Sequence, residues 1–323
     1  MSKTRWWILL LGPLAILAVS FVLSRWLWVA PGGPPASNHF LISVAEAAPA
    51  APSHAEDERL AADCQAVARH LAPLLGPDCH TIVRPPFVVA GDLEQPALDA
   101  WYDETISPAT RAMARQFLST LPDRPITVLL WSGEASYNYY AEKLYGDRNV
   151  SIYGYYKPSS RTLVLNIGTG GGTLVHELTH ALVDFDFPEM PDWFNEGLAS
   201  LHEQCRFREE ADGPSIEGLE NWRLSGLQKA IRAGKLRSLE SLLSADDFRG
   251  RQQGLNYAQA RYLCLYLERQ GLLSDFYHRF RRTHTDDPHG VRALAAIVPD
   301  FSWQSLDEQF QNWVLTLEYR PHQ

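Results

Sequence analysis

The sequence lacks any cluster of basic residues. Its 29 lysines and arginines are scattered over 323 residues and are outnumbered by 38 aspartates and glutamates, which gives a formal charge of −9. Because binding of nucleic acids depends on clustered lysine and arginine contacts to phosphates, we expect no nucleic acid partner. Internal repeats of roughly 20–50 residues are also absent, so the chain does not read as a repeat protein.

Cysteine is scarce as well, and the four cysteines do not have zinc-finger spacing. A small number of cysteines suits an exported protein in which they pair. Cys64 and Cys79 flank an expected helix, so one bridge could join its start to the loop that follows. Cys205 and Cys264 would form a second bridge if their helices pack together. Buried free thiols are the alternative, because sequence alone does not set the connectivity.

The amino terminus carries a long uncharged run. Lys3 and Arg5 precede an apolar segment from Trp6 to Ser24, which is about the roughly 20 residues that a helix needs to cross a bilayer. Arg25 follows the segment, where a cleaved signal peptide would have small residues. We therefore favour an uncleaved signal anchor in residues 1–30 over a cleaved signal peptide. The positive end stays in the cytoplasm in either case. The chain is then a single-pass membrane protein whose remainder is extracytoplasmic, and periplasmic in a bacterium.

Residues 31–57 are rich in proline, alanine and glycine and are expected to form an extended, semi-rigid linker. The remaining residues, 58–323, have room for one large or two modest domains with an ample core.

Hydrophobic periodicity predicts an α+β fold, with a sheet part at about 84–172 and a mainly helical part at about 173–320. Before the sheet part we expect a helix at 56–75. Within the sheet part we expect helices at 107–120 and 136–145, an extended segment at 87–90, a strand at 126–131, and a strand pair at 150–156 and 161–167. In the second part we expect helices at 193–207, 216–234, 238–244, 255–270, 272–283, 289–297 and 302–317. Glycines at 168 and 170–172 separate the two parts.

One motif carries chemistry: His176-Glu177-Leu178-Thr179-His180. On a helix, the two imidazoles lie one turn apart and can reach the same metal ion. Glu177 lies beside them, where it can accept a proton from a metal-bound water without being a ligand. The alternative is a surface helix that happens to carry two histidines. Its aliphatic neighbours argue against this, because burying the three polar side chains is costly unless a metal pairs them.

A catalytic zinc ion has three protein ligands and one open position. Glu196, in a second apolar and helix-like stretch, is the natural third ligand, and Glu189 and Glu203 are the competing carboxylates. Asp184, four residues after His180, is one candidate to accept the second N–H of that histidine. Thr173 is a suitable N-cap for the helix.

The two motifs together, His-Glu-x-x-His and Asn195-Glu196-Gly197-Leu198-Ala199, resemble those of the gluzincin zinc metallopeptidases. This is the superfamily of thermolysin and the membrane alanyl aminopeptidases, and the chain most resembles its peptidase MA-like family. The resemblance covers roughly residues 120–320. Weaker matches lie at 153–156, 161–166, 257–260 and 266–271.

The resemblance implies a small mixed sheet, then a zinc-binding helix and a helical half, with the active site in a cleft between them. It implies one Zn²⁺ per chain, bound by His176, His180 and Glu196, with Glu177 as the catalytic base. In related aminopeptidases a tyrosine downstream of the ligand glutamate stabilises the oxyanion. Tyr257 is at a comparable distance here, and Tyr262 is its rival.

By the same resemblance, the strand at 162–167 is the edge strand that pairs with an extended substrate. Asn166, Ile167 and Gly168 would then face the substrate backbone. The chain departs from the thermolysin pattern at Ser200, where those enzymes have an acid that orients a ligand histidine.

The implied function is that of a membrane-anchored, extracytoplasmic zinc peptidase, whose partners are a peptide or protein substrate and, through its amino-terminal helix, the membrane. One alternative is a non-catalytic cell-envelope binding or scaffold protein that retains the fold. That alternative predicts the loss of a ligand or of the base, and all four residues are present. Another alternative is a zinc hydrolase of a non-peptide amide, which would use the same chemistry.

Overall fold

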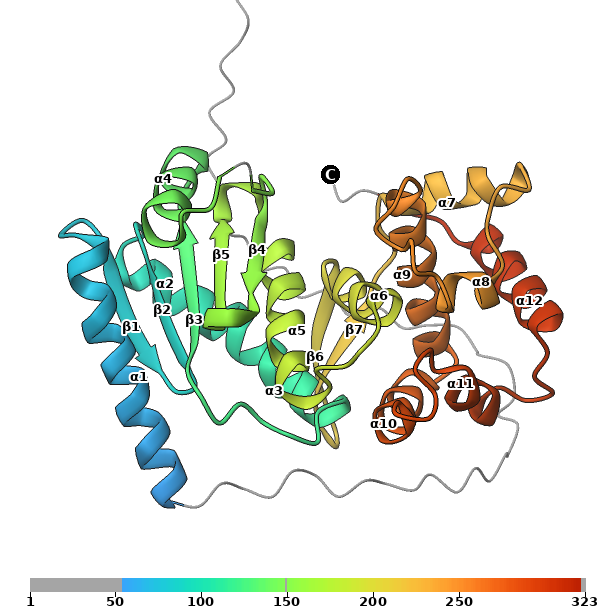
Figure 1. The fold of residues 1–323 in the computed structure, drawn as a ribbon, viewed down its shortest axis with the longest axis horizontal. Coiled ribbons are helices and arrows are strands. Elements are labelled where there is room, and N and C mark those ends of the chain that lie inside the picture. The colour runs from blue at the N-terminus through green and yellow to red at the C-terminus, as the bar shows by residue number, and fades with distance from the viewer. Residues whose placement is uncertain (1–53, 149, 321–323) are drawn as a thin grey trace, which may run out of the picture. The chain divides into compact units, whose positions relative to one another are not determined.

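A five-stranded mixed sheet organises the first half of the chain (Figure 1). The structure is a computed structural model, and it describes residues 54–148 and 150–320. The strands are β1 (His80–Arg84), β2 (Phe87–Gly91), β3 (Ile126–Trp131), β4 (Gly154–Lys157) and β5 (Thr162–Asn166). Their order in the sheet is β1-β2-β3-β5-β4. The three central strands are parallel, and each outer strand pairs antiparallel with its neighbour.

Helices cover both faces of the sheet, which explains why its central strands are almost entirely apolar. In β3, Leu129 and Trp131 face α1 (His54–Leu75) and α4 (Glu134–Tyr145). Val128 and Leu130 point to the other face, which packs against helices later in the chain. These helices are α2 (Gln95–Trp101), α3 (Ser107–Gln116) and α5 (Gly172–Asp186), and a π-helical turn at Tyr102–Ile106 joins the first two.

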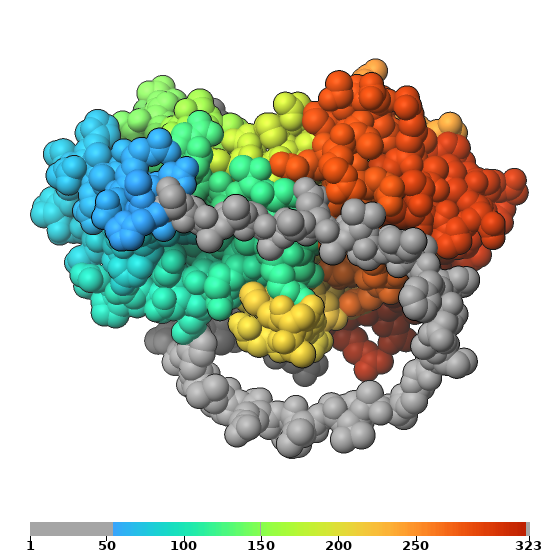
Figure 2. All heavy atoms as spheres, turned by 90° about the horizontal axis from the view of Figure 1, so that it is seen from below, coloured from blue at the N-terminus to red at the C-terminus, as the bar shows by residue number. Residues whose placement is uncertain are grey.

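The second half is mainly helical. Its helices are α6 (Asp192–His202), α7 (Arg223–Arg232), α8 (Leu239–Leu243), α9 (Gln253–Arg269), α10 (Leu273–Thr283), α11 (Val291–Ile297) and α12 (Trp303–Thr316). A two-stranded hairpin, β6 (Cys205–Glu210) and β7 (Gly213–Gly218), follows α6. In the space-filling view the yellow hairpin lies at the surface between the green and the orange parts of the chain (Figure 2). The predicted α+β class, with a small mixed sheet, is confirmed.

The hairpin is the main error in the predicted elements. The sequence predicts continuous helices at 193–207 and 216–234, whereas the first ends at His202 and a strand occupies the start of the second. The exposed face of β6 is charged, with Arg206 and Arg208 pointing to solvent. Because charged residues are also common on exposed helix faces, the period-two pattern is weak here. Strand β1 and helix α2 were not predicted either.

Two smaller expectations are also wrong. Helix α5 begins at Gly172 with Gly171 as its N-cap, so Thr173 lies inside the first turn. A Cβ atom on Gly172 would lie 2.4 Å from the carbonyl oxygen of Glu203, so packing against the end of α6 shapes this helix start. The expected linker 31–57 ends earlier than predicted, because α1 already includes His54.

The expected anchor in residues 1–30, and the linker as far as residue 53, lie outside the described residues. Among the residues that are described, no helix is both long and apolar enough to cross a membrane.

The four cysteines are free thiols, so neither expected disulfide is present. Cys64 and Cys264 are completely buried, and burial raises the pKa of the Cys64 thiol to about 11. The Cys79 sulfur lies 3.4 Å from the Tyr140 hydroxyl.

Candidate metal centre and cleft

Helix α5 carries His176, Glu177 and His180 on its half-buried side. The opposite side packs into the core through aliphatic residues such as Leu174 and Leu178, both completely buried. The three polar side chains are therefore partly buried next to core residues, as the aliphatic neighbours in the sequence indicated.

Polar contacts fix the middle and the end of α5. The Thr179 hydroxyl lies 3.1 Å from Nδ1 of His202, which is fully buried on α6. At the carboxyl end, the buried Asp186 accepts hydrogen bonds from the backbone N–H of Thr120 at 2.6 Å and from the Tyr277 hydroxyl at 2.8 Å. Because buried carboxylates are costly unless they are fully hydrogen-bonded, Asp186 ties this helix to its neighbours with little freedom.

Helix α6 brings Glu196 to face α5. Trp193 and Phe194, in its first turn, pack against Phe276 of α10 with ring centroids 5.8 and 4.9 Å away. Gly197 permits a close approach to α9, because a Cβ atom there would lie 2.9 Å from the Cys264 sulfur. The Glu-Gly pair of the second motif thus has a packing reason as well as a chemical one.

Three side-chain atoms converge between the two helices. The Nε2 atoms of His176 and His180 are 3.1 Å apart, and each lies 3.5 or 3.6 Å from Oε2 of Glu196. A tetrahedral zinc ion with bonds of about 2.0–2.2 Å separates its ligand atoms by about 3.3–3.5 Å. The three observed distances bracket this value, so the residues fit such an ion. Among the described residues, this is the group of histidines and acids that could hold a metal ion.

The electrostatics of the group also suit a cation. Burial opposes ionisation of Glu196, but the nearby imidazoles of His176 and His180 hold its pKa well below its usual range. Oε2 of Glu196 is buried and has no hydrogen-bond partner. Since a buried anionic oxygen without a partner is costly, its position is best explained by a bound cation.

His180 is oriented by a neighbour that the sequence analysis did not assign. Its Nδ1 lies 2.7 Å from Oδ1 of Asn195, which can only accept a hydrogen bond. The candidate for this contact, Asp184, instead accepts a hydrogen bond from the Tyr156 hydroxyl at 3.0 Å. Asn195 was visible in the Asn-Glu-Gly motif, but only as part of the pattern.

The two competing carboxylates lie elsewhere. Glu203 is paired with Arg223 at 2.5 Å, and Glu189 is exposed and lies 3.7 Å from the imidazole of His284. Glu196 is therefore the acid that meets the two histidines.

A cleft of about 1270 Å³ opens beside the metal centre. The cleft is lined on the helical side by His176, Glu177 and Tyr257. On the side of the sheet it is lined by Tyr153 and Gly154. Its volume exceeds the roughly 300–1,000 Å³ of pockets for small ligands. The side chains of Glu177 and His176 thus face a space that can hold an extended molecule.

Of the two candidate oxyanion tyrosines, Tyr257 lines this cleft. Burial, followed by the negative charge of Glu196, raises the pKa of Tyr257, so its hydroxyl remains protonated. Tyr262 is completely buried, and its hydroxyl bonds the backbone of Asn221.

The prediction that the strand at 162–167 is the edge strand is wrong. Strand β5 lies between β3 and β4, so the edge strand is β4. Asn166 is buried and donates to the Ile152 carbonyl at 3.1 Å, while Ile167 and Gly168 begin a 3₁₀ turn. None of these three residues lines the cleft. The sequence showed the strand pair correctly but could not show which member was outermost, because this depends on pairing with β3.

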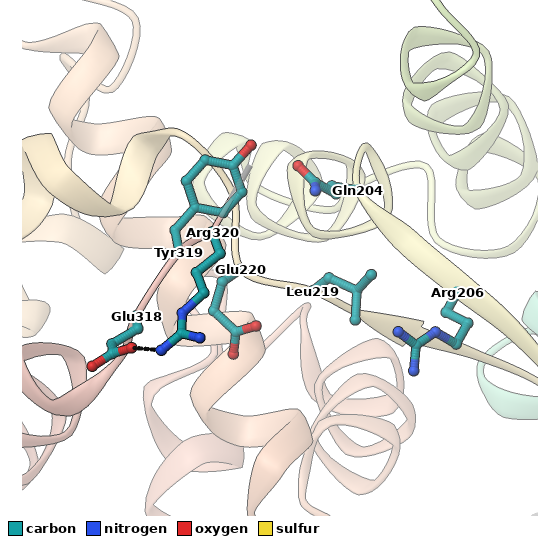
Figure 3. Close-up of a pocket in the computed structure, with 7 residues that line it drawn as sticks. All are labelled: Gln204, Arg206, Leu219, Glu220, Glu318, Tyr319 and Arg320. Atoms are coloured by element: carbon teal, nitrogen blue, oxygen red, sulfur yellow. Dashed lines mark hydrogen bonds and ion pairs between the residues drawn. The ribbon is translucent and has the colours of Figure 1, made fainter. Parts of the chain in front are cut away.

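A second pocket, of about 370 Å³, lies near the carboxyl-terminal end of the described chain. Figure 3 shows Glu318, Tyr319 and Arg320 on one side of it and Arg206 on the other, with Glu318 paired to Arg320 at 2.8 Å. Gln204 borders both pockets. None of His176, His180 and Glu196 lines this smaller pocket.

The other residue that sequence reasoning missed is Arg249. Its Nη2 lies 2.8 Å from Oε1 of Glu196, although the two residues are far apart in the chain and share no motif.

No protein-family model matches the chain, and no curated protein matches it either. The motif resemblance and the geometry of the site therefore carry the functional argument.

Proposed function

We propose that the protein is a zinc-dependent peptidase of the gluzincin type. The observation that supports this most is the convergence of His176, His180 and Glu196 at tetrahedral ligand spacing, with Glu177 beside them on the cleft. Zinc is the ion that this set of two imidazoles and one carboxylate most commonly binds in hydrolases.

When bound, zinc would act as a Lewis acid that polarises the scissile carbonyl and acidifies a water molecule. Glu177 would accept the proton of the attacking water and return it to the leaving amine. Tyr257 would donate a hydrogen bond to the carbonyl oxygen as negative charge develops on it.

The edge strand supports a peptide as the substrate class. In the described part of the chain, β4 pairs only with β5, and Gly154 at its start lines the cleft. An unpaired strand edge can hydrogen-bond an extended peptide along its backbone. A peptide that lies along β4 would run past His176 and Glu177, which line the same cleft.

The charge of the cleft favours an acidic segment of substrate. Lys229 and Lys235 line it on the α7 side, and neither forms an ion pair within the described residues. Arg223 lines it too, but Glu203 neutralises that charge. These two positive charges on the wall of the cleft would attract glutamate or aspartate side chains of a substrate.

We also propose that residues 1–30 anchor the enzyme in the cell membrane and that the catalytic residues are extracytoplasmic. The support is the long uncharged run behind Lys3 and Arg5.

The direct test is metal analysis and a peptide-library assay of the full-length chain, purified in detergent without chelators. We expect about one zinc per chain and hydrolysis that a chelator abolishes and added Zn²⁺ restores. Bound zinc with no hydrolysis of any peptide would favour the scaffold or the non-peptide amide hydrolase. Protein without zinc, before and after addition of Zn²⁺, would contradict the metal site.

A further inference from the structure

Arg249 lies on the loop between α8 and α9 and makes three hydrogen bonds and one further ion pair with three residues around the proposed metal centre. Its Nη2 contacts Oε1 of Glu196 at 2.8 Å and Oδ1 of Asp192 at 3.1 Å, and its Nε contacts Oδ2 of Asp192 at 3.1 Å. Its Nη1 donates to the Tyr257 hydroxyl at 3.2 Å. A guanidinium has five N–H donors in a fixed planar fork, and here three of them form hydrogen bonds while its charge faces Glu196.

The loop around Arg249 is itself fixed. The preceding residue, Phe248, is buried and packs against the Tyr257 ring at a centroid distance of 5.3 Å. Its carbonyl accepts a hydrogen bond from Asn256 at 2.8 Å. Asp247 pairs with Arg237 at 3.1 Å. The guanidinium is therefore presented from a well-anchored backbone, although the side chain itself is half exposed.

The contact with Arg249 divides the two oxygens of Glu196 between different partners. Oε1 binds the guanidinium, whereas Oε2 is buried without a hydrogen-bond partner and faces the two imidazoles. A carboxylate with both oxygens free can bind a cation through one or through both. With Oε1 occupied, Glu196 offers the ion a single oxygen, which preserves a fourth position for water or substrate.

The same guanidinium also orients the Tyr257 hydroxyl. A tyrosine hydroxyl has one proton, and its oxygen accepts the hydrogen bond from Arg249. The hydroxyl proton remains available to donate, and the Glu196 carboxylate, which raises the pKa of Tyr257 after burial does, is one acceptor within its reach.

We propose that Arg249 is a positioning residue that holds Glu196 in its one-oxygen mode, with Asp192 fixing the guanidinium. This role rests on the proposed metal site. A simple charge effect predicts the opposite result for the metal, because removing a cation beside Glu196 would strengthen binding of Zn²⁺. The two effects can therefore be separated.

The test compares Arg249→Ala and Arg249→Lys with the wild type, in the full-length protein loaded with Co²⁺ or with Zn²⁺. Lysine retains the charge but cannot reach three acceptors in a fork, so it should not restore the geometry. The matched control is Arg251→Ala, which removes an exposed arginine from the same loop. Circular dichroism checks that each variant is folded.

We expect the visible absorption of the Co²⁺ form to weaken in both Arg249 variants, because a second carboxylate oxygen raises the coordination number. Zinc release to a chelator should be about 10–100-fold faster, as is typical when a residue that supports a ligand is lost. The Arg251→Ala protein should match the wild type in both measurements.

Unchanged spectra and release rates in both Arg249 variants would overturn the proposed role. Slower zinc release in Arg249→Ala alone would also overturn it, because it would assign a purely electrostatic effect to the arginine. A wild-type protein that binds neither ion would refute the metal site itself, and this role with it.

Discussion

Oδ1 of Asn195 accepts a hydrogen bond from Nδ1 of His180 at 2.7 Å. Since the amide oxygen cannot donate, the contact places the proton of His180 on Nδ1 and leaves the lone pair of Nε2 directed at Glu196 and His176. The residue next to the proposed metal ligand thus selects the tautomer that can bind a metal.

Replacing Asn195 should therefore weaken the metal site without touching a ligand. We expect Asn195→Ala to lower the affinity for zinc by about 10–100-fold, because the His180 ring loses the partner that fixes its tautomer and orientation. Asn195→Asp retains an acceptor and should stay close to wild type. Competition with a chromogenic chelator measures both affinities, and equal affinity in all three proteins would show that Asn195 has no such role.

Gly197 should be intolerant of even one added methyl group. In Gly197→Ala the new Cβ atom would lie 2.9 Å from the Cys264 sulfur and 3.0 Å from the backbone oxygen of Ala260, so α6 and α9 must separate. Overpacking of this kind costs about 1–3 kcal/mol of unfolding free energy. Denaturant unfolding measures the loss.

Gly226 provides the matched control for that variant, because it is also inside a helix but has open space around the position of a Cβ atom. Gly226→Ala should leave stability unchanged or raise it by about 0.4–1 kcal/mol. Equal losses in the two alanine variants would argue against close helix packing as the reason for Gly197.

Acid should destabilise the fold through His202. Complete burial, followed by the positive charge of Arg261, lowers the pKa of His202 from 6.5 to about 3. As the pH falls through this window the unfolded chain binds a proton that the folded chain does not. Unfolding therefore becomes easier, by ~1.4 kcal/mol per pH unit for one proton. His202→Gln should flatten this slope, and an unchanged slope in denaturant unfolding from pH 6.5 to 4 would contradict the assignment.

Glu268 should have the opposite effect over part of this range. Burial raises its pKa from 4.5 to about 7, so between these values the folded state holds a proton that the unfolded state has lost. The contribution of Glu268 to the free energy of unfolding is therefore fully present below pH 4.5, and it is lost as the pH rises toward 7. Glu268→Gln should remove this loss, so its stability should rise more steeply with pH than that of the wild type. If the unfolding free energies of the wild type and of Glu268→Gln change in parallel with pH, the raised pKa of Glu268 is refuted.

The proposed preference for acidic substrates depends on Lys229 and Lys235. Fluorescence anisotropy on zinc-loaded Glu177→Gln protein should give tighter binding to glutamate-containing peptides than to matched lysine peptides. Adding Lys229→Glu and Lys235→Glu together should reverse the order, because the charge of the cleft wall changes sign.

The control is Arg232→Glu. Arg232 lies on α7, as Lys229 does, but it does not line the cleft. The preference should survive this change apart from weak long-range effects that salt screens. A preference unaffected by the lysine reversal, or equally affected by the control, would contradict a role for the two lysines.

Local patterns in the sequence were enough to predict the elements that carry the proposed ligands. Strand β3 has the predicted bounds, and helices α5 and α6 start within two residues of expectation. Their signals are strong because a buried strand is continuously apolar and because the motif residues share one helix face. Helix geometry predicted the pairing of His176 with His180, and the setting of Glu196 in the Asn-Glu-Gly motif favoured it over Glu189 and Glu203. The structure brings the three residues together.

The surroundings of that group could not be predicted, because they depend on contacts between distant segments. Arg249 lies 57 residues after Asp192, which it pairs with, and nothing in the local sequence marks the pairing. The position of β4 at the sheet edge is similar, since it follows from β5 pairing with β3 rather than from the composition of either strand. The β6–β7 hairpin was missed because one of its faces is charged and exposed.

The peptide-hydrolysis rate of the Glu177→Gln protein at full zinc occupancy is the most direct test of the proposed mechanism. The amide has nearly the same shape as the carboxylate, and the change leaves the proposed ligands His176, His180 and Glu196 in place, so the fold and the zinc content should be unchanged. It cannot accept a proton from water, so we expect the rate to fall by at least about 10²–10⁴-fold. Glu196→Gln should instead lose affinity for zinc, because a neutral oxygen replaces an anionic one. Hydrolysis at nearly the wild-type rate by fully zinc-loaded Glu177→Gln protein would contradict the account.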